Sequence, residues 1–376
     1  MDCQHAVSHT NFSTNQTHHV VKLSSQDYVT ISLHGIVSTI GIVENLLILG
    51  IVGFRVRRSI ISVWILNLAA SDLLATAFLP FFTLYLARGN TWTLGPTFCR
   101  IYSSIFFLNM FVSAFLLAAI SLDRCLVVVK PVWTQNHRSI QMVRNVCWVI
   151  WTCAVVCTIP FYMFRDAIPG RPGKVFCYYN YARFLPKEPY DLKALCKQRK
   201  EGLAFMKLLL GFLIPLTIII ISYVTVSQSL ARRGSRRPFR FVRLVVTVVV
   251  VFVLCWAPYH LFIILEVLAP KGSPTQKFAS RALLTATTIG FLNSTINPIL
   301  YVFSCPDLCN KIRQSLGAVM ETVLAEDLGE LSRRRSTRSS LSNSEFMVRK
   351  KSCSTALVLK SEDRDQNEVP SLQSQN

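Results

Sequence analysis

Long stretches without charge constrain the fold of this chain more than any other feature. Seven of them approach or exceed the ~20 residues that a helix needs to cross a lipid bilayer. They are 28–54, with only Glu44 charged; 59–87, with only Asp72; 101–122; 146–164; 202–230, with only Lys207; 244–265; and 282–306. Lipid offers no hydrogen-bond partners, so each segment must be helical to satisfy its own backbone groups. The sequence therefore predicts an all-α membrane protein, a seven-transmembrane helix bundle.

The low content of charged residues argues against a soluble fold. Asp, Glu, Lys and Arg make up 16% of the 376 residues, against ~25% in soluble domains. The alternative is a large soluble protein with buried helices, but seven such segments would leave it too little polar surface. The sequence also has no metal-ligand spacing, phosphate-binding loop or nucleophile triad. We therefore predict no enzyme, no cofactor and no nucleic-acid partner.

The flanking segments predict which side of the membrane each end occupies. The first 27 residues lack the apolar core of a cleavable signal peptide, so the first helix is expected to act as the insertion signal. Glycosylation sequons begin at Asn11 and Asn15, which favours an N-terminus outside the cell. The three inner loops then hold 13 Lys and Arg, as the positive-inside rule requires. The outer segment 165–201 departs from that rule, with nine bases and four acids.

Polar and proline motifs recur through these segments, one set in each. In chain order they are Asn45, Asp72, "SLDRC" (121–125), Trp151, Pro215 with Tyr223, "CWAPYH" (255–260) and "NPILY" (297–301). Any one of these motifs could arise by chance, but their order is highly specific. Over residues ~28–323 the chain resembles a rhodopsin-like (class A) G-protein-coupled receptor, which implies a plasma-membrane protein and a G-protein partner.

The resemblance and the composition together divide the chain into four parts. Residues 1–27 are expected to form an extracellular glycosylated N-terminus, and 28–304 the helix bundle. Apolar residues at helical spacing predict a short amphipathic eighth helix, lying at the interface, over 306–324. Residues 325–376 are polar and Ser-rich and are predicted to form a disordered cytoplasmic tail. Phosphorylation at Ser336, Thr337, Ser339 and Ser340 by receptor kinases would make this tail acidic and recruit arrestin.

Four cysteines lie on the predicted outer side: Cys3, Cys99, Cys177 and Cys196. Four cysteines can form two disulfides in three ways. The resemblance implies a disulfide between Cys99 and Cys177, which leaves Cys3 and Cys196 to pair with each other.

The buried acid Asp72 needs hydrogen-bond partners or a cation, because a carboxylate is costly inside a membrane. The resemblance places four polar residues around it as a sodium pocket in which Asp72 would bind the ion: Asn109, Ser113, Asn293 and Asn297. A purely structural hydrogen-bond network is the alternative. A sodium ion is therefore the one metal that we expect, and its role would be allosteric.

The resemblance also implies a set of residues that switch the receptor on. They are Asp123, Arg124, Tyr223, Phe252, Trp256, Pro258 and Tyr301. Pro258 kinks its helix beside Trp256, and Arg124 would meet the G protein. The usual tyrosine after Arg124 is replaced by Cys125, and the stretch "RRPFRFVRLV" (236–245) offers Arg124 no acid. Asp123 is therefore expected to be the partner of Arg124.

Lys207 is the only charge in its segment and lies eight residues before Pro215, in the outer half of the membrane. A charge at the bilayer centre costs roughly 2.5–3.5 kcal/mol on insertion scales. The lysine could reach sideways to the lipid headgroups, or it could face the bundle and bind an anion. The basic outer loop, Arg165 at membrane depth and the absence of a buried acid other than Glu266 favour an anion site.

Aromatic residues are predicted to surround this lysine. Phe81, Phe82 and Tyr85 belong to the second segment; Tyr102, Phe106, Phe107 and Met110 to the third; and Tyr178, Tyr179 and Tyr259 can donate hydrogen bonds. Such stripes are more often packing than a ligand site. Here they enclose a cation without a partner, so the sequence predicts a long apolar pocket with a positive end, suited to a lipophilic carboxylate.

Finer motifs narrow the resemblance to the chemoattractant branch of the family. They include "SSIFFLNMF", "FCYYN" and "CWAPYHLFIILE". The resemblance implies prostaglandin D2 as ligand, its carboxylate held by Arg165, Tyr179, Lys207 and Tyr259, and signalling through inhibitory G proteins in chemotaxis and inflammation. Phe106, Phe107, Phe82 and Tyr178 complete the predicted ligand-binding residues. Tyr102 departs from the pattern, which has His there. The alternatives are a peptide chemoattractant receptor, of the formyl-peptide or complement type, and a membrane transporter.

Overall fold

The structure, a computed structural model, describes residues 25–170, 174–184, 192–233, 238–304 and 314. The chain divides into two compact units, Met1–Lys311 and Ile312–Asn376, and the helices described below belong to the first. Several predictions lie outside the described residues: the sequons at Asn11 and Asn15, the eighth helix except for Gln314, and the Ser-rich tail with its phosphorylation sites.

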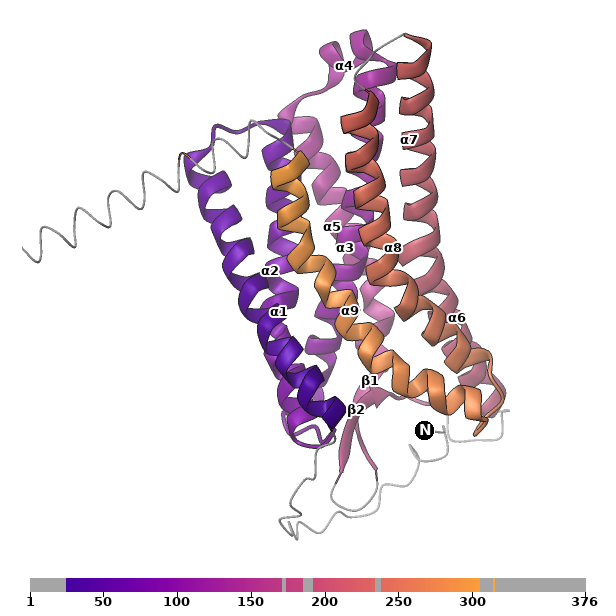
Figure 1. Cartoon of the computed structure of the whole chain (residues 1–376). Coiled ribbons are helices and arrows are strands. Elements are labelled where there is room, and N and C mark those ends of the chain that lie inside the picture. The colour runs from indigo at the N-terminus through magenta and orange to yellow at the C-terminus, as the bar shows by residue number, and fades with distance from the viewer. Residues whose placement is uncertain (1–24, 171–173, 185–191, 234–237, 305–313, 315–376) are drawn as a thin grey trace, which may run out of the picture. The chain divides into compact units, whose positions relative to one another are not determined.

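Seven helical rods make up the described part of the first unit (Figure 1). They are α1 (Ser25–Gly50) with the π-helical turn η2 (Ile51–Arg55), α2 (Ile60–Ala87), α3 (Gly95–Val129), α5 (Ile140–Phe164), α6 (Leu192–Leu208) continued by the π-helical turn η3 (Leu209–Leu213) and α7 (Ile214–Arg232), α8 (Pro238–Leu268) and α9 (Pro274–Ser304). The short α4 (Pro131–His137) joins α3 to α5. The rods extend beyond the uncharged cores because charged residues can continue a helix once it leaves the lipid.

Within the described residues, six helical spans are long and apolar enough to cross a membrane. They correspond to the first six segments predicted from the sequence. The seventh, α9, also forms a continuous helix, but Asn293, Ser294 and Asn297 lower its hydropathy. These three side chains are buried, so the polarity of α9 faces the bundle rather than the lipid.

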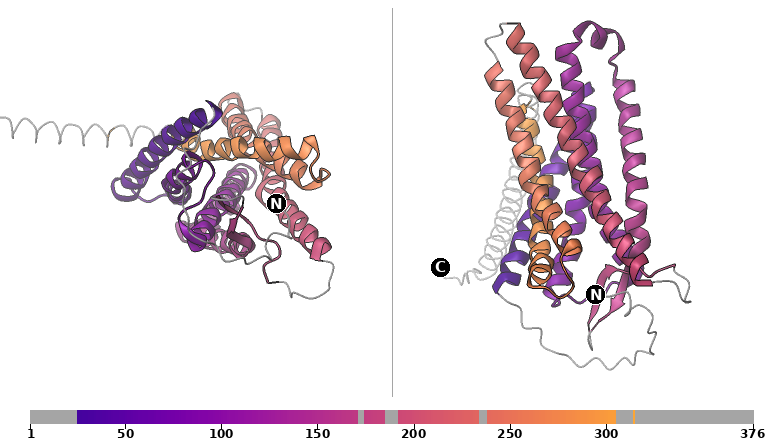
Figure 2. Two further views of the ribbon diagram at one scale, coloured as in Figure 1. Left: turned by 90° about the horizontal axis from the view of Figure 1, so that it is seen from below. Right: turned by 90° about the vertical axis from the view of Figure 1, so that its right-hand side faces the viewer.

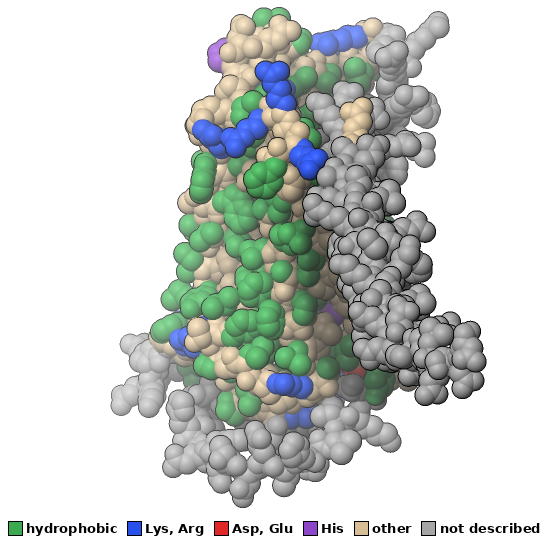
Figure 3. Space-filling view, turned by 90° about the vertical axis from the view of Figure 1, so that its left-hand side faces the viewer, with side chains coloured by type: hydrophobic (Ala, Val, Ile, Leu, Met, Phe, Trp, Pro, Cys, Tyr) green, Lys and Arg blue, Asp and Glu red, His purple; other side chains and the backbone are tan. Residues whose placement is uncertain are grey.

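Helix α3 lies at the centre of the bundle, where it packs against α2, α5 and α7 (Figure 2). In its most apolar stretch 67% of the residues are buried, against 22% for α5. The outward face of α5 carries exposed Trp148, Val149 and Val156. In Figure 3 apolar side chains cover the middle of the face in view, and Lys and Arg gather toward its ends. This distribution suits a bundle surrounded by lipid and capped by water.

A two-stranded hairpin covers one end of the bundle, which we call the hairpin end (Figure 1). Strands β1 (Arg165–Pro169) and β2 (Val175–Tyr179) pair antiparallel, with Arg165 opposite Tyr179. The sequence analysis did not predict these strands. Arg100 of α3 holds β1 in place, because its Nε donates to the carbonyl of Arg165 and its Nη2 lies 3.1 Å from Oδ1 of Asp166.

The predicted disulfide between Cys99 and Cys177 is confirmed and ties β2 to the start of α3. Cys196 is also disulfide-bonded. Its predicted partner, Cys3, lies outside the described residues, so that pairing stays a prediction.

Candidate ligand-binding site

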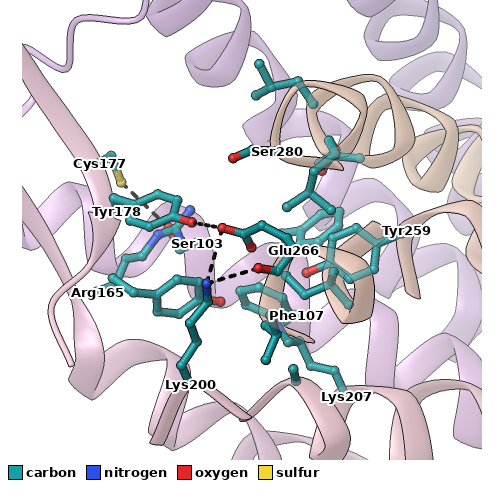
Figure 4. Close-up of a pocket in the computed structure, with 18 of the residues that line it drawn as sticks. Ser103, Phe107, Arg165, Cys177, Tyr178, Lys200, Lys207, Tyr259, Glu266 and Ser280 are labelled. Atoms are coloured by element: carbon teal, nitrogen blue, oxygen red, sulfur yellow. Dashed lines mark hydrogen bonds and ion pairs between the residues drawn. The ribbon is translucent and has the colours of Figure 1, made fainter. Parts of the chain in front are cut away.

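A cavity of about 150 Å³ lies inside the hairpin end, between α2, α3, the hairpin, α6, α8 and α9. We call it the inner cavity (Figure 4). All eight residues predicted to bind the ligand line it: Phe82, Phe106, Phe107, Arg165, Tyr178, Tyr179, Lys207 and Tyr259. Tyr85 and Tyr102 line it as well. Residues from four crossings and one loop therefore line the same cavity, and their role in ligand binding stays a prediction.

Lys207 points into the bundle and is 1% exposed. Its Nζ lies 5.3 Å from the ring centroid of Phe107, 5.5 Å from Phe161, 5.4 Å from Tyr179 and 5.8 Å from Tyr259. Within the described part of the chain, no hydrogen bond or ion pair reaches this ammonium. The alternative in which Lys207 extends to the headgroups is therefore wrong. Ring faces attract a cation but contribute only ~0.5–2 kcal/mol each, so the ammonium can still gain from an anion.

The π-helical turn η3 lies directly after Lys207, between it and Pro215. Such a turn inserts one extra residue, and each residue turns a helix by ~100°. The extra residue therefore rotates α6 relative to α7, so that the two helices present different faces to the bundle. Pro215 cannot donate a backbone hydrogen bond, which favours an irregular turn at this place. The sequence showed the proline but not the inserted residue.

Arg165 is the second cation of the inner cavity. Its guanidinium carbon lies 4.5 Å from the ring centroid of Tyr179, and its Nε donates to Oγ of Ser103 at 2.8 Å. The Tyr179 ring therefore lies within reach of both Arg165 and Lys207. Sequence reasoning missed Ser103, because a serine on an apolar helix has no pattern that marks it as a partner of a loop arginine.

Tyr179 and Tyr259 each bring a hydroxyl group to the inner cavity. The Tyr179 hydroxyl is buried and has no partner among the described residues. Burial raises the pKa of the Tyr179 phenol far above its ordinary value, and the nearby Arg165 opposes this only in part. The phenol therefore stays protonated at neutral pH and can donate a hydrogen bond to an anion.

Glu266, the one buried acid near Lys207 among the described residues, is bound by other groups (Figure 4). Its Oε1 lies 3.5 Å from Nζ of Lys200 and accepts a hydrogen bond of 3.0 Å from the Tyr178 hydroxyl. The acid that could have neutralised Lys207 is thus paired with Lys200. Lys200 was not among the predicted site residues; its place seven residues before Lys207 on the same helix could have indicated it.

The floor of the inner cavity is continuous with the predicted switch residues. The Phe106 ring lies 6.0 Å from Trp256, 5.6 Å from Tyr259 and 5.1 Å from Phe291, measured between centroids. Trp256 is 1% exposed and packs against Gly290, where an added Cβ would lie 3.4 Å from the indole ring. A ligand that displaced Phe106 would therefore press on Trp256.

Phe252 and Pro258 belong to the same region of α8. Phe252 is buried and stacks on Phe212 of η3, with 5.6 Å between ring centroids. Pro258 lies inside α8, where it removes a helical hydrogen bond.

Two predicted pocket residues are not in the inner cavity. Phe81 packs on Phe98 at 4.8 Å, and Met110 is fully buried in the core.

Asp72 lies at the centre of a polar cluster deep in the bundle and is fully buried. Its Oδ1 accepts hydrogen bonds from Asn109 at 3.0 Å and Ser113 at 3.4 Å, and its Oδ2 accepts one from Asn297 at 2.9 Å. Three of the four predicted partners are therefore in direct contact with it. Ser71 and Ser294 join the cluster through Asn109 and were not predicted.

This cluster also holds oxygens without partners. The side-chain Oδ1 atoms of Asn293 and Asn297 are buried and unpaired among the described residues. Asn297 donates to the Asp72 carboxylate, so the free Oδ1 of Asn297 belongs to the same cluster, whereas no contact links Asn293 to Asp72 among the described residues. Carboxylate and amide oxygens are donors that suit a hard cation. No group of three or more His, Cys, Asp or Glu that could hold another metal occurs in the described ranges.

At the opposite end of the bundle, Asp123 pairs with Arg138 and not with Arg124. The Arg138 Nε and Nη2 donate to the two carboxylate oxygens at 2.7 and 2.8 Å. The prediction that Asp123 is the partner of Arg124 is therefore wrong, because a bidentate arginine from the loop after α4 occupies both oxygens. Tyr223 accepts a hydrogen bond from Ser121 at 3.2 Å. Tyr301 lies on α9, and its side chain is outside the described part.

Comparison with known proteins places this site in a family context. The sequence profile of the "7 transmembrane receptor (rhodopsin family)" matches residues 44–301. The "Prostaglandin D2 receptor 2" of Mus musculus is 52% identical over 301 residues, 80% of this chain and 78% of the mouse protein. The "Chemerin-like receptor 1" of Homo sapiens is 35% identical over 305 residues, covering 80% of this chain and 81% of its own length. The "C3a anaphylatoxin chemotactic receptor" of Oncorhynchus mykiss is 33% identical over 304 residues, 80% of each chain.

Proposed function

The chain belongs to the rhodopsin family of seven-transmembrane receptors, and from this premise we propose that it is a receptor for a lipophilic carboxylate, most specifically prostaglandin D2. As a member of that family it is a multi-pass membrane protein with a ligand and a G protein as partners. Its relatives are receptors and not enzymes, in agreement with the sequence analysis, and the transporter alternative has no support among them.

The observation that carries the proposal is the unpaired ammonium of Lys207. It is buried among four aromatic rings, and no acid reaches it in the described part of the chain. A buried cation without a counter-charge is costly. A ligand carboxylate would supply the missing charge, with Arg165 on the other side of Tyr179 as the second cation.

The remaining lining suits the rest of a lipid acid. Phe82, Phe106 and Phe107 present ring faces to an acyl chain, and each buried CH₂ contributes ~0.8 kcal/mol. The inner cavity, at about 150 Å³, is smaller than the ~300–1,000 Å³ of typical ligand pockets. Binding must therefore widen the inner cavity. A movement of Phe106 away from the cavity and toward Trp256 would transmit this change to the predicted switch residues.

The finer predictions about signalling belong to this proposal. We infer a plasma-membrane receptor with its N-terminus and the hairpin end outside, and with Arg124 at the inner end, where an inhibitory G protein would bind. Receptor kinases and arrestin would act on the tail. The predicted sodium pocket of Asp72, Asn109, Ser113, Asn293 and Asn297 would hold an allosteric sodium ion, which would compensate the charge of the buried Asp72 carboxylate.

Replacing the lysine tests the ligand class directly. Lys207→Ala should weaken the binding of labelled prostaglandin D2 at least about tenfold, because a charge-assisted contact of ~1.5–3 kcal/mol is lost. Lys197→Ala removes the same charge from an exposed place on α6 and should leave affinity near that of the unaltered chain. Equal affinities for Lys207→Ala and the unaltered chain, at matched surface expression, would rule the proposal out.

A peptide ligand is the second candidate, because two of the relatives described above carry the names of chemerin and C3a receptors. A larger cavity of about 730 Å³, which we call the outer cavity, lies beyond the inner one and could admit a peptide end. A calcium or cAMP response to a chemoattractant peptide that survives Lys207→Ala would favour this candidate over the lipid acid.

A further inference from the structure

Three lysines follow one another at intervals of seven residues along α6: Lys193, Lys200 and Lys207. Seven residues make about two turns, so the three share one face of the helix at steps of ~10 Å. Lys193 lines the outer cavity, Lys207 the inner cavity, and Lys200 lines both. The face of α6 therefore leads from the outer cavity to the anion site.

The boundary between the two cavities includes the contact of Lys200 with Glu266. Lys200, Glu266 and Tyr178 line both cavities. The Lys200 ammonium lies 3.5 Å from the carboxylate, whose side chain is 8% exposed, and Tyr178 donates to the same oxygen. Of the ion pairs formed by the described residues, this is the one that joins α6 to α8. A ligand that moves from the outer cavity to Lys207 along the face of α6 passes this ion pair.

The charges on this path favour an anion. The outer cavity is lined by four lysines and two glutamates, so it attracts a carboxylate. The same negative charge would be repelled by Glu266 if that acid were not neutralised. At the boundary the ligand can take the place of Glu266 on Lys200, since both are carboxylates. Glu266 would keep the hydrogen bond from Tyr178 while Lys200 holds the ligand.

We propose that Lys200 is a transit site for the carboxylate of the ligand, opened when the ligand replaces Glu266 on the Lys200 ammonium. The inference rests on the proposed function, because it takes the lipid acid bound at Lys207 as its end point. It adds a binding residue to the access path and assigns Glu266 and Tyr178 the role of closing that path. A transit site stabilises the passage and not the bound state, so it changes both rates and leaves affinity in place.

The test measures association and dissociation rates of labelled prostaglandin D2 on the full-length receptor in membranes. Lys200→Gln should slow both rates by about fivefold or more and leave Kd within about twofold. Glu266→Gln should speed both rates, because Lys200 then needs no exchange. Lys200→Arg keeps the charge and should stay close to the unaltered receptor, which separates loss of charge from loss of fold.

Lys197→Gln is the matched control, because Lys197 lines the outer cavity but not the inner one. If Lys197→Gln and Lys200→Gln slow association equally, the effect is long-range attraction and the transit site is ruled out. Unchanged rates in Lys200→Gln, or a change in dissociation alone, would also overturn it. If Lys200→Gln leaves both rates unaltered while Lys207→Ala weakens binding, this inference is overturned but the proposed function is kept. Absence of prostaglandin D2 binding to the unaltered receptor would overturn both.

Discussion

At the scale of single residues, the two cations of the inner cavity, Lys207 and Arg165, are held in place by neutral groups and not by acids. Lys207 is held by ring faces, and Arg165 by a neutral serine and by Tyr179. Neutral partners keep each side chain in place without cancelling its charge. Both positive charges therefore remain for a ligand, whereas Glu266, which could have cancelled one of them, is occupied by Lys200 and Tyr178.

Ser103 is expected to position Arg165 for the ligand. Ser103→Ala removes the 2.8 Å hydrogen bond to Nε, and a hydrogen bond to a charged group contributes ~1.5–3 kcal/mol at most. Because Arg165 keeps its contact with Tyr179, we expect prostaglandin D2 affinity to fall by about three- to tenfold. Ser280→Ala, which removes a hydroxyl from the same cavity but not from Arg165, should bind normally in the same competition assay. Equal affinities for the two variants would contradict this role.

At the scale of elements, the hairpin and the π-helical turn bring the two cations to the same cavity. The disulfide between Cys99 and Cys177 fixes β2, and the antiparallel register then sets Arg165 opposite Tyr179. The turn η3 lies between α6 and α7 and changes the rotation of one helix relative to the other, so Lys207 of α6 faces the cavity independently of the face that α7 presents. The hairpin thus contributes Arg165 and Tyr179 to the inner cavity, and α6, which η3 follows, contributes Lys207.

Arg100 is expected to keep β1 on the end of α3. Arg100→Ala removes the ion pair with Asp166 and the hydrogen bond to the Arg165 carbonyl. The ion pair is partly exposed and contributes little by itself, so the fold should persist. Hydrogen–deuterium exchange of 165–169 should become faster, and ligand affinity should fall severalfold. Arg88→Ala, an exposed change at the same end, provides the comparison; if the two variants exchange alike, Arg100 does not hold the hairpin.

At the scale of the whole bundle, α3 and α8 both line the inner cavity and extend from it to the opposite end of the bundle. The Phe106 ring lies 6.0 Å from Trp256 of α8, and α3 also carries Asn109 of the Asp72 cluster and, further along, Arg124. In the described residues Arg124 has no acidic partner, since Asp123 is bound by Arg138.

Arg124 lies far along α3 from the ligand, so its loss should separate binding from signalling. We expect Arg124→Ala to bind prostaglandin D2 with affinity close to that of the unaltered receptor and to lose ligand-stimulated G-protein activation. Arg144→Ala, which removes an exposed base from the same end, should signal normally. Nucleotide exchange on an inhibitory G protein measures this outcome, and signalling by Arg124→Ala comparable to that of Arg144→Ala would refute it.

The sequence by itself indicated the seven helices and the receptor family, and it named eight residues that line the inner cavity; their role in ligand binding stays a prediction. Apolar length and the order of the motifs are local properties, and lipid permits only one backbone structure for such segments. The tertiary structure decided where each charge is neutralised. It paired Glu266 with Lys200, gave Asp123 to Arg138, turned Phe81 and Met110 away from the cavity and added the hairpin. These outcomes depend on the phase of each helix and on residues distant in sequence, and one inserted residue at η3 changes that phase without leaving a pattern in the sequence.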